Sequence, residues 1–490
     1  MMLLPACFFQ GSQDRILSAR LGDVGDFSAR APRASFLPTT VAGSTMEVYV
    51  YVLVLAIAAA MLAGAPSSVS AFQIGPHVRQ ESFRPSFSKL SVYVNVAEEA
   101  PRSVQPFDEW ATACGVQRCG GFQLTSEDEY GQNIGVMTTE NLPAGSPVLF
   151  VPGNMILSSY QAAAEVGRID AAEKRLVSAK AADHVPQFYL FLKLLYEYEQ
   201  GDASPYYPWF DSLPRYFSSG SSMTPFCFEC LPPLAGYLAM NERVRYIQFF
   251  QALRYVPFLS EETKKNKALT RWAFALVYTR GLTAPDGDVR LVPMADYFNH
   301  GTETEVEISF TDEGDCVAYA SRDVPAGSPL RISYGDPTNP SALFAKYGFL
   351  DESSPATFCK ILIKRPSKEL VDMGYDHSKM VFYKDTGEVS PQVYDVLLYQ
   401  ILQEMNPSDM QRLYEAHMRG DVATKQAIHQ QYYPQTAAAL VKHVNGFLND
   451  LNTLKSKSIG KDPAQHPRLP LIMAHNEFVR ETFEKVSANL

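Results

Sequence analysis

The chain has 490 residues, of which 46% are hydrophobic and 20% are charged, and this composition is ordinary for globular proteins. A chain of this length forms two or three domains and can bury sizeable cores without disulfides or metals. The formal net charge of −10 argues against a general nucleic-acid-binding protein, which needs a basic face.

The first 71 residues are predicted to form a signal-peptide-like region. Residues 48–63 are an unbroken apolar run, a little shorter than the ~20 residues that a membrane-spanning helix prefers. The small residues that follow end at Ala71 with the small-x-small pattern of a signal-peptidase site. A retained transmembrane anchor is the alternative, and the sequence leaves open whether translation starts at Met1 or Met46.

Residues 72–103 are predicted to form a transit-peptide-like segment and a linker. The stretch after Ala71 is rich in Arg and Ser and poor in acidic residues, as transit peptides are. The Ala71–Phe72 junction resembles the one in bipartite presequences of complex algal plastids, where a signal peptide precedes the transit peptide. The resemblance implies import into the plastid (chloroplast) and no stable membrane association after processing.

Two short strands and then a long helical region follow. Residues 134–139 and 148–151 are strand-like runs, and a Pro-Ala-Gly sequence at 143–145 makes the turn between them. Apolar residues then recur at helical spacing, and the last such run ends with Arg280. We therefore expect a helical insertion over residues 157–288.

The seven cysteines are scattered and form no cluster with the spacing of a zinc site. The single CxxC motif, Cys227 to Cys230, has no second pair of ligands, so a metal there is the less favoured interpretation. We expect incidental thiols in a reducing compartment.

Strand character returns at residue 289. Apolar and polar side chains alternate over residues 305–310, with Glu305 at a polar position, which predicts one buried and one solvent-exposed face. Turns at 312–315 and at a second Pro-Ala-Gly sequence, 325–327, separate three strands. We expect these strands to form a small antiparallel meander.

The chain is predicted to be helical from about residue 361 to its end. Ser408 and Gln411 have the spacing of a capping box, and Gly420 is suited to end a helix. The last helix begins near Leu471.

Several motifs stand in order along this framework. They are Gly135-Val-Met-Thr-Thr-Glu-Asn-Leu-Pro-Ala-Gly145 leading into Val148-Leu-Phe-Val-Pro152, the helix end Trp272 to Arg280, Leu291-Val-Pro-Met-Ala-Asp-Tyr-Phe-Asn-His300, Ile332-Ser-Tyr-Gly335 followed by Asn339, and Lys346-Tyr-Gly-Phe-Leu350. This set resembles the SET-domain methyltransferases, and within them the branch that includes the Rubisco large-subunit and plastid aldolase lysine methyltransferases. The resemblance covers about residues 104–490.

The resemblance implies an α+β fold. The small β-sheets of a SET domain, with a pseudoknot-like threading, come from residues 104–156 and 289–360, and the helical insertion 157–288 splits them. An all-helical substrate-binding domain, residues 361–490, follows.

The resemblance also implies S-adenosylmethionine as the cofactor and no metal. In enzymes of this kind the first strand gives backbone contacts, an arginine lies near the cofactor's carboxylate, an Asn-His pair holds its amino end and adenine, and an aromatic residue packs on the adenine. The matching residues are Ile134, Gly135 and Val136, then Arg280, then Asn299 and His300, and last Phe349. A family glycine is replaced here by Asn133, which tolerates a positive φ.

Tyr347 is the predicted catalytic residue. Methyl transfer to lysine is an in-line displacement by a neutral amine, so positioning supplies most of the rate. Lysine, with a reference pKa of about 10.4, must first lose a proton, which desolvation in a narrow channel beside a sulfonium favours. A tyrosine hydroxyl can orient the amine, and the resemblance adds Tyr334 and Asp296 as substrate-binding residues.

The sequence thus predicts a protein-lysine N-methyltransferase that acts on a non-histone plastid protein, such as the Rubisco large subunit or aldolase, and works as a monomer. A protein-histidine methyltransferase and a non-catalytic binding protein on the same fold are the alternatives. Lysine is favoured because the histidine-modifying relatives have lost the tyrosine that this chain keeps as Tyr347.

Overall fold

A computed structural model describes residues 92–126, 133–358, 367–375 and 379–490 of the chain. The predicted signal-peptide-like region and most of the predicted transit segment lie outside these residues. Among the helices in the described ranges, none is both long and apolar enough to cross a membrane.

Two four-stranded sheets of the described residues carry the candidate site. In the first sheet the antiparallel strands run in the order β1 (Gln117–Arg118), β4 (Pro147–Val151), β10 (Cys316–Ala320) and β9 (Val306–Phe310). In the second sheet the order is β2 (Phe122–Ser126), β3 (Ile134–Thr138), β11 (Pro329–Ile332) and β8 (Asn299–His300), and only β11 and β8 pair in parallel. Helix α2 (Val104–Ala113) precedes both sheets in the chain.

The two Pro-Ala-Gly turns lead from one sheet to the other. The turn at 143–145 connects β3 to β4, and the turn at 325–327 connects β10 to β11, and in both cases the two strands belong to different sheets. The predicted meander is therefore wrong in one respect, because β9 and β10 pair whereas β11 lies between β3 and β8. The reason is that each turn glycine, Gly145 or Gly327, redirects the chain at a φ of 80° or 82° without forming a hairpin.

The two crossover turns hold each other by reciprocal hydrogen bonds. In each turn one backbone N–H bonds to a carbonyl of the other turn, and one backbone N–H bonds to an Asn or Asp side chain of the other turn. The bonds, all 2.8 Å long, run from Leu142 N to Val324 O, from Val324 N to Leu142 O, from Ala144 N to Asp323 Oδ1 and from Ala326 N to Asn141 Oδ1.

A helical region lies between the two sequence segments that form the sheets. It contains α3 (Ser159–Val166), α4 (Asp170–Ser178), α5 (Val185–Glu199), α6 (Tyr207–Ser212), α7 (Pro225–Glu229), α8 (Pro233–Ala252), α9 (Glu261–Lys265) and α10 (Lys267–Arg280). The 3-10 helix η1 (Gly153–Met155) precedes this region, and short 3-10 helices join its α-helices: η2 (Ala182–His184), η3 (Gly201–Ala203), η4 (Gly220–Ser222) and η5 (Leu253–Tyr255). The helical spacing that predicted a helix ending at Arg280 is confirmed by α10.

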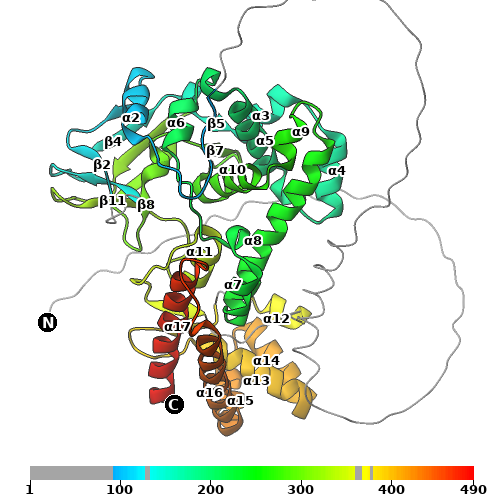
Figure 1. Cartoon of the computed structure of the whole chain (residues 1–490). Coiled ribbons are helices and arrows are strands. Elements are labelled where there is room, and N and C mark those ends of the chain that lie inside the picture. Colours follow the sequence, from blue (N-terminus) through cyan, green and yellow to red (C-terminus); the bar gives the residue numbers. More distant parts are fainter. Residues whose placement is uncertain (1–91, 127–132, 359–366, 376–378) are drawn as a thin grey trace, which may run out of the picture. The chain divides into compact units, whose positions relative to one another are not determined.

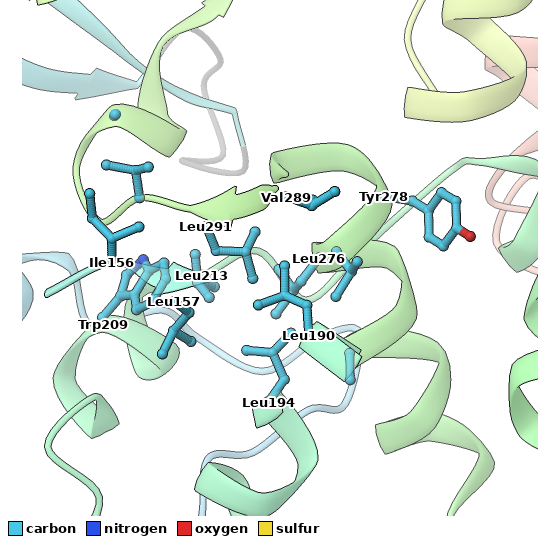
Figure 2. Close-up of a cluster of buried hydrophobic side chains, with 14 of the residues drawn as sticks. Ile156, Leu157, Leu190, Leu194, Trp209, Leu213, Leu276, Tyr278, Val289 and Leu291 are labelled. Atoms are coloured by element: carbon cyan, nitrogen blue, oxygen red, sulfur yellow. The ribbon is translucent and has the colours of Figure 1, made fainter. Parts of the chain in front are cut away.

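This region packs on a three-stranded sheet of β5 (Leu157–Ser158), β7 (Val289–Leu291) and β6 (Leu282–Thr283). Figure 2 shows the shared core, in which apolar side chains of the sheet meet those of α5, α6 and α10. Leu157 and Leu291 come from the sheet, Leu190 from α5, Trp209 from α6 and Leu276 from α10, and each is at most 3% exposed. The helices are thus anchored to the strands that lead into the candidate site.

The C-terminal part of the chain is mostly helical. After α11 (Pro340–Tyr347) come β12 (Ala356–Phe358), α12 (Lys368–Asp372) and β13 (Val381–Tyr383), and then α13 (Pro391–Met405), α14 (Pro407–Arg419), α15 (Val422–Gln431), α16 (Tyr433–Ser458) and α17 (Leu469–Asn489), which are orange to red in Figure 1. Strands β12 and β13 form an antiparallel pair. The predicted helical character of the C-terminal region is confirmed, but the prediction of an all-helical domain over residues 361–490 is wrong, because β13 lies within this range and pairs with β12 just before it.

Two local predictions for this part have different outcomes. Gly420 ends α14 at a φ of 71°, as its position in the sequence indicated. The predicted capping box of Ser408 and Gln411 is wrong, because Asn406 is the N-cap and its side chain accepts the Asp409 N–H. A Pro at the first helical position sets the helix start one residue after Asn406.

Glu305 is also placed differently from its prediction. It was expected on a solvent-exposed face, but it is 3% exposed. Its carboxylate accepts hydrogen bonds from Arg331 at 2.9 and 3.0 Å and from Arg322 at 2.6 Å. Burial of this carboxylate is stable because two guanidinium groups and a backbone N–H satisfy it.

Candidate active site

Strand β11 brings together the two segments predicted to bind the cofactor. Its Leu330 pairs with Val136 of β3, and its Ile332 pairs with His300 of β8. The Asn299 side chain also reaches the start of β3, where its Nδ2 donates to Asn133 Oδ1 at 3.3 Å. The predicted residues Ile134, Gly135 and Val136 therefore lie one strand away from Asn299 and His300, on the two sides of β11.

His300 is held in one orientation by two contacts. Its Nδ1 accepts the backbone N–H of Tyr334 at 3.1 Å, so the ring proton belongs on Nε2. Nε2 lies 3.4 Å from Asp351 Oδ2, too poorly aligned for a full hydrogen bond but close enough for attraction. Burial lowers the pKa of His300, and Asp351 opposes the shift only in part. The imidazole is therefore neutral at pH 7, with its protonated Nε2 near the Asp351 carboxylate.

His300 joins an aromatic cluster with Tyr334, Tyr347 and Phe349. The ring centroids of Tyr334 and Tyr347 are 4.8 Å apart, and those of His300 and Phe349 are 5.6 Å apart. Both tyrosine hydroxyls are fixed, because Tyr334 donates to the carbonyl of Phe298 at 2.7 Å and Tyr347 donates to the carbonyl of Tyr334 at 3.2 Å. The cluster thus presents two oriented hydroxyl oxygens.

Gly348 allows Tyr347 and Phe349 to join the same cluster. It ends α11 in the left-handed conformation with a φ of 80°, which turns the chain sharply between the two aromatic residues. A Cβ at this position would lie 2.5 Å from the carbonyl carbon of Ser218. Both the conformation and the close backbone approach require glycine.

A pocket of about 330 Å³ opens beside the two tyrosines. Its lining includes Arg280, Asp296, Tyr334 and Tyr347, which the sequence predicted as site residues. Apolar side chains form much of the remaining wall, namely Leu282, Phe298, Ile308, Phe310 and Ile332. The predicted residues Ile134, Gly135, Val136, Asn299, His300 and Phe349 do not line this pocket. His300 and Phe349 adjoin it through the ring of Tyr334.

Asp296 lies at the buried end of a polar network on this pocket. Trp209 of α6 donates its indole N–H to Asp296 Oδ2 at 3.2 Å, and Arg280 Nη1 lies 3.4 Å from the same oxygen. Arg280 also donates to the backbone carbonyl of Asp296 and lies over the ring of Tyr297 at 5.6 Å. Burial raises the pKa of Asp296, while the charge of Arg280 and the Trp209 hydrogen bond oppose this shift.

Two buried polar atoms of this network find no hydrogen-bond partner among the described residues. They are Nε of Arg280, a donor, and Oδ1 of Asp296, an acceptor. Buried polar groups are normally satisfied, so this pair points to a ligand with both a carboxylate and a donor group. A zwitterionic amino-acid moiety has that chemistry, as does a polar group of a peptide.

Sequence reasoning missed several residues that shape the site. Trp209 comes from α6 in the helical region, outside the recognised motifs, and contacts Asp296. Lys346 lines the pocket and Asp351 contacts His300, and both flank the recognised Tyr-Gly-Phe motif. Their positions next to the motif were the available signal. Within the described residues, no group of three or more His, Cys, Asp or Glu side chains could hold a metal ion.

Comparison with known proteins identifies similar sequences over part of the chain. Residues 133–335 match the family model described as SET domain. "SET domain-containing protein 8" of Schizosaccharomyces pombe (strain 972 / ATCC 24843) is 28% identical over 119 residues. That match covers 23% of this chain and 28% of the length of the yeast protein.

Several solved structures share the fold over most of the chain. The structure of Rubisco LSMT bound to AdoMet has a TM-score of 0.56 at 15% identity and covers 80% of this chain and 92% of its own. The same protein bound to sinefungin and monomethyllysine has a TM-score of 0.57 at 15% identity with the same coverage. The SET domain of LSMT bound to MeLysine and AdoHcy has a TM-score of 0.57 at 16% identity and covers 80% and 91%. The predicted resemblance to SET-domain methyltransferases of the Rubisco type and the predicted α+β fold are confirmed.

Proposed function

We propose that the protein is an S-adenosylmethionine-dependent protein-lysine N-methyltransferase. The observation that carries this proposal is the pocket in which the fixed hydroxyls of Tyr334 and Tyr347 stand beside the Arg280–Asp296 pair. The similarity to a SET domain supports it, as do the AdoMet, AdoHcy and methyllysine named for the similar structures.

The residues of the site fit S-adenosylmethionine. The unpartnered donor of Arg280 suits the carboxylate of the amino-acid moiety, and a guanidinium binds carboxylates well. We assign the remaining contacts to the backbone of Ile134, Gly135 and Val136, to Asn299 and His300, and to the ring of Phe349. When bound, the cofactor supplies a methyl group on a sulfonium cation.

The chain's own residues position the amine and help it to lose its proton. An ammonium that enters a pocket with apolar walls loses hydration, and this desolvation lowers its pKa. The Tyr347 oxygen can accept a hydrogen bond from the entering amine and so hold its lone pair in one direction. Because Tyr347 is tied to the Tyr334 backbone, the accepting oxygen moves little.

A plastid location and a non-histone substrate complete the proposal. The apolar run 48–63, the Ala71–Phe72 junction and the basic segment after it support plastid import. The Rubisco large subunit and aldolase are the candidate substrates, docked by residues 361–490. A fusion of residues 46–100 to a fluorescent protein should enter the plastid, and Phe72→Ala should keep the fusion outside. Wild-type fluorescence in the cytosol would refute the location.

Methyl transfer from labelled S-adenosylmethionine into a plastid extract tests the activity. Acid hydrolysis of the labelled protein should release methyllysine. Release of methylhistidine would make the protein a histidine methyltransferase. Cofactor binding without any transfer would leave a binding protein on the same fold.

A further inference from the structure

Lys346 is a cation on the wall of the pocket that the proposed reaction does not use. It occupies the last turn of α11, directly before Tyr347. Its Nζ lies 4.7 Å from the centroid of the Tyr347 ring, and its side chain helps to line the pocket. Lys346 and Tyr347 therefore share the wall of one pocket.

The charges on the pocket wall do not balance within the described residues. The lining contains three charged side chains, Arg280, Asp296 and Lys346. Arg280 and Asp296 form an ion pair at 3.4 Å and so offset each other. No carboxylate of the described residues lies within ion-pair distance of Lys346, which leaves one uncompensated positive charge.

The charge of Lys346 affects the pKa of one carboxylate, that of Glu242, but this carboxylate already has another partner. Glu242 of α8 is 6% exposed and forms an ion pair with Arg245. Burial raises the pKa of Glu242, and the charges of Arg245 and Lys346 only oppose this shift. Glu242 therefore cannot turn toward Lys346 without leaving Arg245 unpaired in a half-buried position.

We propose that Lys346 forms a subsite for a carboxylate side chain next to the target lysine of the substrate. This inference rests on the proposed lysine methyltransferase function. A target lysine arrives as an ammonium, and a wall with one net positive charge disfavours it. An adjacent Asp or Glu of the substrate that pairs with Lys346 removes this penalty. Lysines with an acidic neighbour are thus the preferred substrates, and lysines among basic residues are rejected.

The test compares the full chain with Lys346→Gln and Lys346→Glu, and with Lys174→Glu as a matched control. Lys174 is an exposed residue of α4 outside the pocket lining. Each protein transfers labelled methyl groups into a plastid extract, and mass spectrometry identifies the modified lysines. The strongest wild-type site is then made as three peptides, with the acidic neighbour retained, changed to Gln, or changed to Lys.

Acidic residues should be enriched beside the lysines that the wild type modifies. Lys346→Gln should lower kcat/KM for the acidic peptide about tenfold, the size of one partly desolvated ion pair. Lys346→Glu should reverse the order of kcat/KM among the three peptides, so that the peptide with a neighbouring Lys becomes the better substrate. Lys174→Glu should leave the order unchanged, and thermal melting should report that all variants fold.

Three results would overturn the inference. The first is labelled sites without acidic enrichment, and the second is an unchanged peptide order in Lys346→Glu. The third is an equal loss for all peptides together with a shifted pH profile, which would mean that Lys346 acts on the amine's pKa. If no protein transfers label, the proposed function itself fails, and calorimetric binding of S-adenosylmethionine distinguishes that failure from misfolding.

Discussion

The hydroxyl of Tyr347 donates a hydrogen bond to the backbone carbonyl of Tyr334 at 3.2 Å, and so links two residues that are 13 positions apart. The ring of Tyr334 is fixed in turn, because its own hydroxyl donates to the Phe298 carbonyl at 2.7 Å. A chain of hydrogen bonds thus runs from the end of α11 to the segment that carries Asn299 and His300. This chain gives the proposed catalytic oxygen a defined position.

Tyr347→Phe should lower turnover by about 10²-fold while cofactor binding survives. The substitution keeps the ring and its contact with Tyr334 and removes only the hydroxyl that orients the amine, and one positioned catalytic group contributes about that much. Single-turnover rates and calorimetry measure the two effects. Tyr237→Phe, at an exposed position of α8, is the control. Full turnover in Tyr347→Phe would make this residue only a wall of the pocket.

Asn299→Ala should weaken the binding of S-adenosylmethionine. The change removes one proposed cofactor contact, and a cofactor group left unpaired on burial costs roughly 1–3 kcal/mol. The lost hydrogen bond to the exposed Asn133 adds little to this cost. Calorimetric titration measures the affinity. Asn445→Ala, at an exposed position of α16, provides the matched control. Wild-type affinity in Asn299→Ala would contradict the assignment.

Gly348→Ala should reduce the free energy of unfolding by at least about 2 kcal/mol. Two effects add up to this loss, because alanine disfavours the left-handed conformation and its Cβ would clash with the Ser218 backbone. Urea unfolding measures this loss. Gly446→Ala is the control, because Gly446 lies inside α16 and a Cβ there meets no atom within 4 Å. That change should stabilise the protein by about 0.5–1 kcal/mol. Equal effects of the two changes would exclude a special role for Gly348.

His475 should make the protein less stable as the pH falls from about 6.5 toward 4. The side chain is 0% exposed, and burial lowers the pKa of His475 to about 4. Below pH 6.5 the unfolded chain then binds more protons than the folded chain. The contribution of neutral His475 to the free energy of unfolding is therefore complete above pH 6.5 and is lost as the pH falls from 6.5 toward 4. The loss from this one group is at most about 3 kcal/mol.

Urea unfolding at several pH values checks this prediction as a difference between proteins. His475→Gln should flatten the dependence between pH 6.5 and 4, because carboxylates titrate in both proteins and cancel in the difference. His466→Gln makes the same chemical change at a partly exposed imidazole and should keep the wild-type slope. An unchanged slope in His475→Gln would sink the proposal.

Periodicity in the sequence predicted most of the elements but not their partners. The helix that ends at Arg280 and the strands on either side of the Pro-Ala-Gly turns lie where the patterns indicated. A turn sequence specifies local dihedral angles, however, and the two turns of equal sequence gave no signal that they connect different sheets. Glu305 was misplaced for a similar reason, since alternation cannot reveal that Arg331 and Arg322 will satisfy a buried carboxylate.

The site was predictable where residues act within a motif. Arg280, Asp296, Tyr334 and Tyr347 come from four sequence motifs and meet in one pocket. Trp209 was not predictable, because its contact with Asp296 joins residues 87 positions apart and Trp209 lies outside the recognised motifs. Roles that depend on such distant contacts need the folded structure.

The reciprocal contacts between the two crossover turns also bear on how the protein folds. The side-chain bonds of Asp323 to Ala144 and of Asn141 to Ala326 join residues 179 and 185 positions apart. Neither turn can complete its hydrogen bonds before the other has been synthesised and brought to it. Loops of this length are slow to close, so the two sheets must assemble in one late, cooperative step. A nascent chain that ends before β11 therefore holds all four strands of the first sheet but lacks an inner strand of the second sheet, and with it Tyr334 and Tyr347 of the pocket wall.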